Sequence, residues 1–188
     1  MTQMPRIWQI DDDYPERMIG EYDRKNGPDR FLLKKGQRLS GLGPWRFAVR
    51  GRASQVRRLD DVANNAMVPL VSPRLAELLM SVAAEDIELL PAEIEASDGT
   101  VGDYRLLNAL ALVHAVDQEQ SEFTLITGSD RIMSFSRLVL RGGCLGDHAL
   151  ARCAEFTSFL LVSGRTAAAI ADAAMIGLQL VMPWEIGP

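Results

Sequence analysis

A phrase that is written twice is the feature that most constrains the fold of this chain of 188 residues. Residues 70–94 read LVSPRLAELLMSVAAEDIELLPAEI, and residues 161–186 read LVSGRTAAAIADAAMIGLQLVMPWEI. The shared frame is Leu-Val-Ser-x-Arg, a stretch with helical spacing, an alternating stretch and Pro-x-Glu-Ile, with one extra residue before Pro183. A chain that repeats such a frame is predicted to repeat a unit of structure.

Each copy has the pattern of a strand, a capped helix and a second strand. Ser72 can cap a helix that begins at Pro73, because a serine hydroxyl accepts a free backbone N–H and proline fits the first helical position. Ser163 stands before an alanine-rich helix in the second copy. Beyond the first helix the apolar period changes to two, and Pro91 is expected to limit that strand. The first helix has one apolar face, made of Leu75, Leu78, Leu79 and Val82.

The repeat has two explanations. It records either a true duplication or a supersecondary unit whose strand-to-helix junction commonly uses a serine cap. Arg74 and Arg165 favour duplication, because a cation in the first turn of a helix gains nothing from the helix dipole and is expected to serve a partner.

The apolar segments between the copies predict further strands. Residues 104–116, 123–127 and 132–140 are strand candidates, although the first is rich enough in alanine and leucine for a helix. We therefore predict an α+β fold with a mixed β-sheet, packed helices and two related strand-helix-strand units at residues 67–95 and 158–187. Residues 1–66 are predicted to form an irregular N-terminal segment packed on a main domain of residues 67–188.

The composition indicates a globular protein without a membrane partner. Apolar residues make up 47% of the chain, which is too many for a disordered one. The first residues lack a secretory pattern, and the apolar stretch 166–184 contains Asp172 and Gln179 and is too short to span a bilayer. Two cysteines, Cys144 and Cys153, suit a reducing compartment. We expect a cytoplasmic protein.

The positive charge is concentrated in one segment. The formal net charge is −5, yet residues 30–59 contain nine Lys or Arg and no acidic residue. With Phe31, Trp45 and Phe47 this segment could follow a phosphate backbone and stack on bases. The alternative is a solvated segment that faces acidic parts of the same protein. The acidic balance of the whole chain argues against nucleic acid as the partner.

Signatures of catalysis and metal binding are weak. Cys144, His148 and Cys153 raise the hypotheses of a zinc site or a Cys/His nucleophile pair, but their spacing fits no finger and no third group orients the histidine. The motifs GxGxxG, GxxxxGK[ST], GxSxG and HExxH do not occur. We therefore predict no catalytic residue, no cofactor and no metal.

The order of several segments resembles a known family. LVSPRLAELL, IELLPAEI, DGTVGDYRLLNAL, VHAVDQEQSEF and LVSGRTAAAI follow one another here as in the immunity-protein family of bacterial polymorphic toxin systems, whose prototype is myxobacterial and which was long a domain of unknown function. The resemblance covers residues 68–186. It implies an antidote that binds and neutralises a cognate protein toxin and is not an enzyme.

The resemblance also directs attention to acidic surfaces, because many such toxins attack nucleic acids and carry basic clefts. The acidic run near the N-terminus, which lacks the glycine and terminal glutamate of a calcium loop, is then the predicted partner-binding segment, with Trp8 as an aromatic anchor. The alternative function is a nucleic-acid-binding module that uses residues 30–58. Four residues that match the family pattern are expected to hold the fold together: Tyr104, Asn108, Asp117 and Ser121. The predicted partner-binding residues are Trp8, Asp11, Asp12, Asp13 and Glu16.

Overall fold

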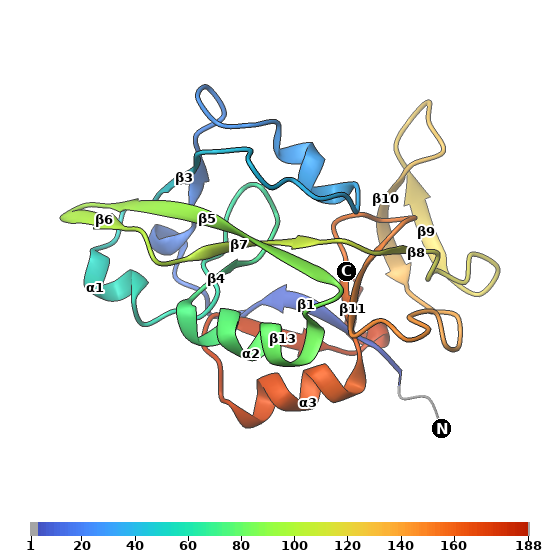
Figure 1. The fold of residues 1–188 in the computed structure, drawn as a ribbon. Coiled ribbons are helices and arrows are strands. Elements are labelled where there is room, and N and C mark those ends of the chain that lie inside the picture. The colour runs from blue at the N-terminus through green and yellow to red at the C-terminus, as the bar shows by residue number, and fades with distance from the viewer. Residues whose placement is uncertain (1–3, 188) are drawn as a thin grey trace.

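The computed structural model describes residues 4–187 and confirms an α+β fold with mixed sheets (Figure 1). One sheet has five strands in the order β13-β1-β12-β11-β8. All of its pairings are antiparallel except that of β11 with β8. Its strands are β1 (Arg6–Ile10), β8 (Leu112–Val113), β11 (Leu150–Cys153), β12 (Leu160–Val162) and β13 (Leu178–Val181).

The second sheet has the order β2-β3-β5-β7-β4, with β6 paired to β5, and β9 and β10 form a separate hairpin. The second sheet contains β2 (Glu21–Tyr22), β3 (Trp45–Ala48), β4 (Leu70–Val71), β5 (Ile87–Ala96), β6 (Gly99–Val101) and β7 (Arg105–Ala109). The hairpin is β9 (Glu122–Leu125) with β10 (Ile132–Arg137). The helices are α1 (Ala53–Val56), α2 (Pro73–Ala83) and α3 (Gly164–Asp172), with 3-10 turns η1 (Glu16–Met18), η2 (Arg30–Lys34) and η3 (Pro183–Glu185).

The two predicted strand-helix-strand units are present as β4-α2-β5 and β12-α3-β13. In each unit the two strands flank a third strand that is antiparallel to both: β7 in the first and β1 in the second. Leu70 and Leu161, the first residues of the repeated phrase, pair with Leu106 and Ile7 of these inserted strands. The similarity therefore extends beyond the repeated phrase, and it favours duplication over a recurring junction.

The predicted serine caps are confirmed. Ser72 Oγ accepts the N–H of Leu75 at 3.2 Å, and Ser163 Oγ accepts the N–H of Thr166 at 3.3 Å. The helices α2 and α3 lie side by side along the lower edge of the molecule in Figure 1. The apolar faces of both helices pack into one core together with residues of both sheets. Neither unit can therefore bury its apolar residues without the other.

The prediction that Pro91 limits a strand is wrong. The strand β5 runs through it to Ala96. The N–H of Ala92 points to β7. The N–H groups of adjacent strand residues point to opposite sides, so the N–H that Pro91 lacks would face β3. Pairing with β3 begins only at Ala92, so no hydrogen bond is lost at Pro91. In the second copy Pro183 instead opens η3. The strand predictions for residues 104–116, 123–127 and 132–140 are confirmed by β7 to β10.

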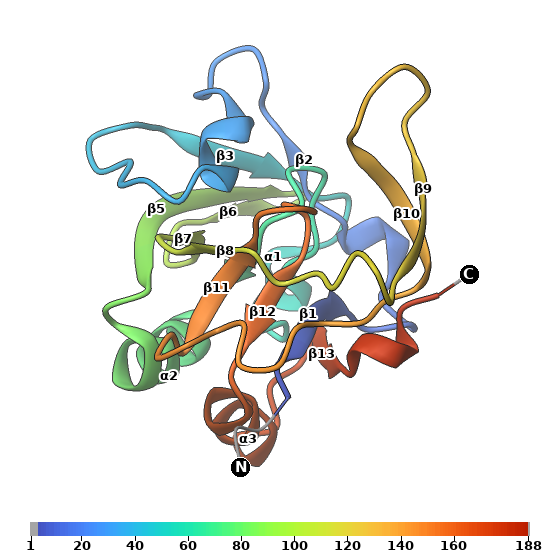
Figure 2. The same cartoon turned by 90° about the vertical axis from the view of Figure 1, so that its right-hand side faces the viewer.

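Strands from the N-terminal third pair with strands from the rest of the chain. Figure 2 shows β1 between β12 and β13, and β3 pairs with β5.

The four residues that match the family pattern all make hydrogen bonds within the chain, as expected. For example, Tyr104 Oη donates to the Leu59 carbonyl at 2.6 Å, and Asn108 Nδ2 donates to the Glu88 carboxylate at 3.0 Å.

The buried carboxylate of Asp60 joins the two units. It accepts hydrogen bonds from Ser72 Oγ at 2.7 Å, from Arg74 Nη2 at 2.5 Å and from the N–H of Ile176 at 2.9 Å. Arg74 also donates to the Ala173 carbonyl at the end of α3. The partner that the first repeated arginine serves is therefore inside the protein, where it links the start of α2 to the end of α3.

Replacing Arg74 with methionine is expected to lower the free energy of unfolding by about 1–2 kcal/mol, because a buried carboxylate loses its charged donor while other donors remain. Arg165→Met is the matched control, since the Arg165 side chain is exposed and has no hydrogen-bond or ion-pair partner within residues 4–187. It should change the free energy by no more than about 0.5 kcal/mol. Urea denaturation measures both, and equal losses would contradict the asymmetry.

Candidate partner-binding site

A pocket of about 390 Å³ opens where β1 ends. We name it the Trp8 pocket. Its rim carries large apolar side chains that face solvent: Ile10 is 44% exposed, Ile19 41% and Met67 58%. Its wall comes from the end of β1, the segment 61–69 and the turn between β11 and β12. An apolar rim around a concave site is typical of binding surfaces.

The register of the sheet brings Trp8 and Arg152 into this wall. Ile7 pairs with Leu161, so Trp8 lies opposite Leu160, and Leu160 pairs with Arg152 on the next strand. Side chains that lie opposite one another share a face of the sheet. A tryptophan, a leucine and an arginine that are distant in sequence therefore form one row.

A buried carboxylate fixes the tryptophan. Asp61 Oδ2 accepts the Trp8 Nε1–H at 2.7 Å, and Asp61 Oδ1 accepts the N–H of Leu70 at 2.9 Å. Burial raises the pKa of Asp61 to about 7, against the lowering effect of these two hydrogen bonds, and the nearby charges of Asp11 and Asp60 raise it further. Trp8 itself is only 7% exposed, so its ring forms wall rather than rim.

The predicted acidic residues lie beside this pocket. They occupy the connection between Ile10 and Ile19, two residues of the pocket rim. Three of the four carboxylates are exposed, whereas Asp11 is half-buried. We name the connection the acidic loop, and its acidic residues are Asp11, Asp12, Asp13 and Glu16.

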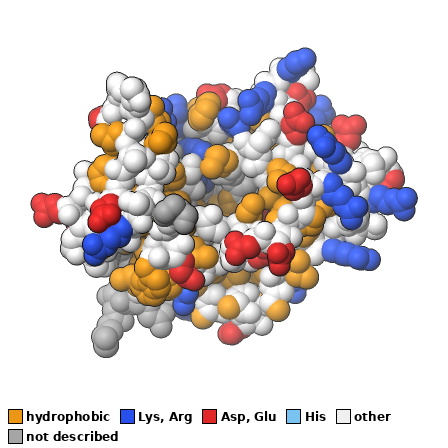
Figure 3. Space-filling view, turned by 180° about the vertical axis from the view of Figure 1, so that it is seen from behind, with side chains coloured by type: hydrophobic (Ala, Val, Ile, Leu, Met, Phe, Trp, Pro, Cys, Tyr) orange, Lys and Arg blue, Asp and Glu red, His pale blue; other side chains and the backbone are white. Residues whose placement is uncertain are grey.

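Hydrogen bonds hold the acidic loop against the fold. Tyr14 Oη accepts the N–H of Ala63, a residue of the pocket wall, at 3.0 Å. Asp11 Oδ2 accepts the N–H of Gly177 at 3.0 Å, and Asp12 Oδ1 accepts from Gln179 at 2.9 Å. Of the five predicted residues, Trp8 thus lies in the pocket wall, Asp11 and Asp12 are held against the chain after α3, and Asp13 and Glu16 belong to the same loop. Figure 3 shows a face on which hydrophobic and acidic side chains surround a hollow, while basic side chains gather at one edge.

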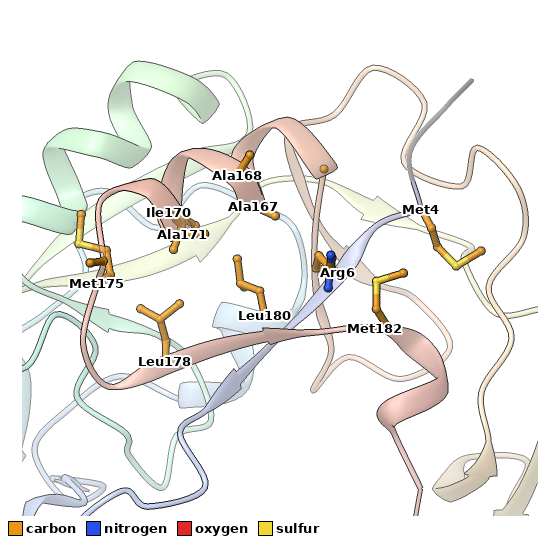
Figure 4. Close-up of a pocket in the computed structure, with 12 residues that line it drawn as sticks. Met4, Arg6, Ala167, Ala168, Ile170, Ala171, Met175, Leu178, Leu180 and Met182 are labelled. Carbon is orange, nitrogen blue, oxygen red and sulfur yellow. The ribbon is translucent and has the colours of Figure 1, made fainter.

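A second hollow, of about 640 Å³, lies between α3 and β13. Figure 4 shows Leu178 and Leu180 of β13 pointing toward α3, with Arg6 near one end. Small alanine side chains line the helix side, and flexible methionines lie near the ends: Met4, Met175 and Met182. We name this hollow the α3 groove. It is less charged than the Trp8 pocket, and the predicted residues do not line it.

The basic segment is only partly available to a ligand. Trp45 and Phe47 are buried at 1% and 2% exposure, so the prediction that they stack on bases is wrong. They pack on Tyr22 because alternate residues of β3 face the core. Arg46 pairs with Glu93 and Arg57 with Asp103. Phe31 remains exposed. Five cations of residues 30–58 are exposed and have no ion pair within residues 4–187: Lys35, Arg38, Arg50, Arg52 and Arg58.

The cysteines and His148 do not form a common centre. Within residues 4–187 there is no group of three metal-ligating side chains. His148 Nδ1 lies 2.6 Å from Asp86 Oδ1. Burial raises the pKa of the Cys144 thiol above its usual value, and burial raises the pKa of Cys153 to about 12. Thiols with raised pKa values are poor nucleophiles at neutral pH.

Sequence reasoning missed two buried ionisable residues of the pocket wall, Asp61 and Arg152. Arg152 stands in an otherwise apolar stretch, ALARCA, whereas Asp61 follows a second aspartate in LDDVA. A lone charge in an apolar strand was the signal that could have identified Arg152, because charged residues are rarely fully buried without a partner. The position of Asp61 depends on contacts with residues far away in the sequence.

These features define an α+β protein with a concave, partly apolar pocket beside an acidic loop. The chain belongs to the immunity protein family Imm11, whose family model matches residues 12–181. No curated protein matches this chain. Within the described residues, the helices are too short or too polar to cross a membrane.

Trp8→Phe keeps the ring but removes the donor to Asp61, and should lower the free energy of unfolding by about 1–3 kcal/mol at about pH 8. The pKa of Asp61 is raised on folding, so the stability due to its protonation is present in acid and lost as the pH rises through about 7. The Trp8 donor stabilises the ionised carboxylate of Asp61 more than the protonated one. The free energy of unfolding of Trp8→Phe should therefore fall by less at about pH 5 than at about pH 8.

Denaturant titrations at both pH values measure this difference. Trp184→Phe is the control, because Trp184 is 66% exposed and its indole donates no hydrogen bond within the described residues. A loss in Trp8→Phe that does not change with pH would argue against the ionisation of Asp61.

Proposed function

We propose that this protein neutralises a cognate bacterial toxin in the cytoplasm by binding it as a one-to-one complex, without catalysing a reaction. The observation that carries the proposal is the coincidence, on one surface, of the apolar rim of the Trp8 pocket and the acidic loop. Membership of an immunity protein family supports the same role.

The two parts of this surface have different tasks in binding. Ile10, Ile19 and Met67 on the rim of the pocket provide apolar area that a partner can cover. Apolar contacts that become buried near the centre of an interface supply most of its affinity. The carboxylates of the acidic loop attract a basic partner and orient it during association. We infer that the toxin presents a basic surface, as an enzyme that acts on nucleic acid does.

The direct experiment is affinity purification of the tagged protein from its native host, followed by mass spectrometry. A toxin encoded by a neighbouring gene, recovered at equal stoichiometry and inhibited by this protein, is the expected result. Recovery of metabolic enzymes alone, with no toxin encoded nearby, would overturn the proposal.

With the toxin in hand, the combined variant Asp12→Lys, Asp13→Lys and Glu16→Lys should weaken binding by about tenfold or more, chiefly through slower association. The control is Glu77→Lys with Glu85→Lys, which reverses exposed carboxylates of α2 and its end that have no ion pair within residues 4–187. Surface plasmon resonance at two salt concentrations separates association from dissociation. Equal weakening by both variants would place the interface elsewhere.

The second candidate function is nucleic-acid binding by residues 30–58, supported by the five exposed cations without ion pairs. If about six cations contacted phosphates, the logarithm of the affinity would fall against the logarithm of salt concentration with a slope near −5. We expect no mobility shift of single- or double-stranded DNA or RNA at low salt, because two of the three aromatic residues are buried. A shift with that slope would instead favour this function.

A further inference from the structure

Arg152 is a cation without a counter-charge in the wall of the Trp8 pocket. Its exposed fraction is 0%, and its Nη1 donates to the Thr157 carbonyl at 2.8 Å. Its Nε and Nη2 have no hydrogen-bond partner, and it forms no ion pair within residues 4–187. Burial lowers the pKa of Arg152 to about 10, so the guanidinium is still charged at neutral pH. A buried charge without partners is costly, which makes this arrangement unusual for a residue with only a packing role.

Other cations lie around the same wall. Lys34 Nζ donates to Ser158 Oγ, a pocket residue, at 3.3 Å. Burial and then repulsion by Arg152 and Arg30 lower the pKa of Lys34 to about 8. Arg30 donates to the carbonyl of Asn65, which also lines the pocket. The three cations form no ion pair within the described residues, so this part of the pocket has an excess of positive charge.

The negative group of the wall does not cancel this charge. Both carboxylate oxygens of Asp61 are occupied, by Trp8 Nε1 and by the N–H of Leu70, and neither accepts from Arg152. The raised pKa of Asp61 leaves it partly protonated near neutral pH, which reduces its negative charge. The balance of charge in the pocket therefore favours an anionic ligand.

We propose that the Trp8 pocket binds an oxyanion, a phosphate or carboxylate group, through Nε and Nη2 of Arg152, with Lys34 as the second cation. The planar guanidinium matches two oxygens of such a group, and bidentate pairs of this kind are strong. Entry requires a small movement of the turn between β11 and β12, whose residues Phe156 and Ser158 share the wall with Arg152. The group comes either from a free anion or from an acidic residue of the bound partner protein.

The first arm of the test uses inorganic phosphate, titrated at constant ionic strength and followed by calorimetry and by NMR shifts of the pocket residues. Wild type should bind one phosphate, and Arg152→Met should weaken that binding by about tenfold or more, as expected for loss of a charge-assisted bidentate contact. Lys34→Met, at a half-buried position, should weaken it as well. Arg58→Met, an exposed cation outside the pocket, is the matched control and should leave phosphate affinity unchanged.

Stability measured without phosphate separates a ligand role from a packing role. Removal of an unpaired buried cation should leave the unfolding midpoint of Arg152→Met at or above that of wild type. If Arg152→Met does not fold, Lys34→Met provides the same comparison.

The second arm uses the purified protein partner. If phosphate does not bind but Arg152→Met or Lys34→Met weakens the protein complex by about tenfold or more while Arg58→Met does not, the partner supplies a carboxylate. Phosphate that binds the pocket variants as tightly as wild type overturns the proposal, and so does absence of an effect in both arms. The phosphate arm needs no toxin, so its result is independent of whether the partner proves to be one.

Discussion

The buried pair Asp60 and Asp61 is the constraint on which the arrangement of the two units depends. Asp60 holds the start of α2 and the chain after α3, whereas Asp61 holds Trp8 of β1 and the start of β4. The backbone N–H groups of both aspartates donate to the Ile176 carbonyl. The next residue, Gly177, packs directly against the backbone of Asp61. A Cβ at Gly177 would lie 2.5 Å from the Asp61 carbonyl oxygen, and the φ of +99° at Gly177 also suits glycine. Two adjacent carboxylates thus connect elements from the start, the middle and the end of the chain.

The position of the candidate site follows from this connection. With Trp8 tied to Asp61, β1 lies between β12 and β13, and its end delivers Ile10 and the acidic loop to the surface. Buried ionic groups contribute little net stability compared with apolar packing, but they penalise arrangements in which they would be unpaired. We therefore regard Asp60 and Asp61 as residues that specify the register of the two units, with the shared apolar core of α2, α3 and both sheets supplying the stability.

How much could be read from the sequence depended on the range of the interactions. The caps Ser72 and Ser163, the two helices and the strand periods are local and were predicted correctly. The prediction for Pro91 was wrong because a missing N–H interrupts a strand only where a neighbouring strand would accept its hydrogen bond. Which strand lies on that side depends on the fold. The insertion of β1 into the second unit has no local signal, since its partners are more than a hundred residues away. The acidic residues were predicted from their charge and from the family resemblance, whereas only the fold shows that their loop connects two residues of the pocket rim, Ile10 and Ile19.

The charges of this surface change sign from its edge to its centre, and this has a consequence for specificity. The acidic loop at the edge favours basic partners in general, because exposed charges act over a distance of about a Debye length. Arg152 in the wall has the opposite preference and acts only on a group that enters the pocket. A partner surface with only basic groups would be attracted by the acidic loop and repelled by Arg152. If the pocket takes an oxyanion as proposed, the partner that fits best carries an acidic group within a basic surround. Rejection of other basic proteins would then rest on repulsion between the buried Arg152 guanidinium and a cation placed at the pocket, which is the repulsive element that discrimination between similar partners requires.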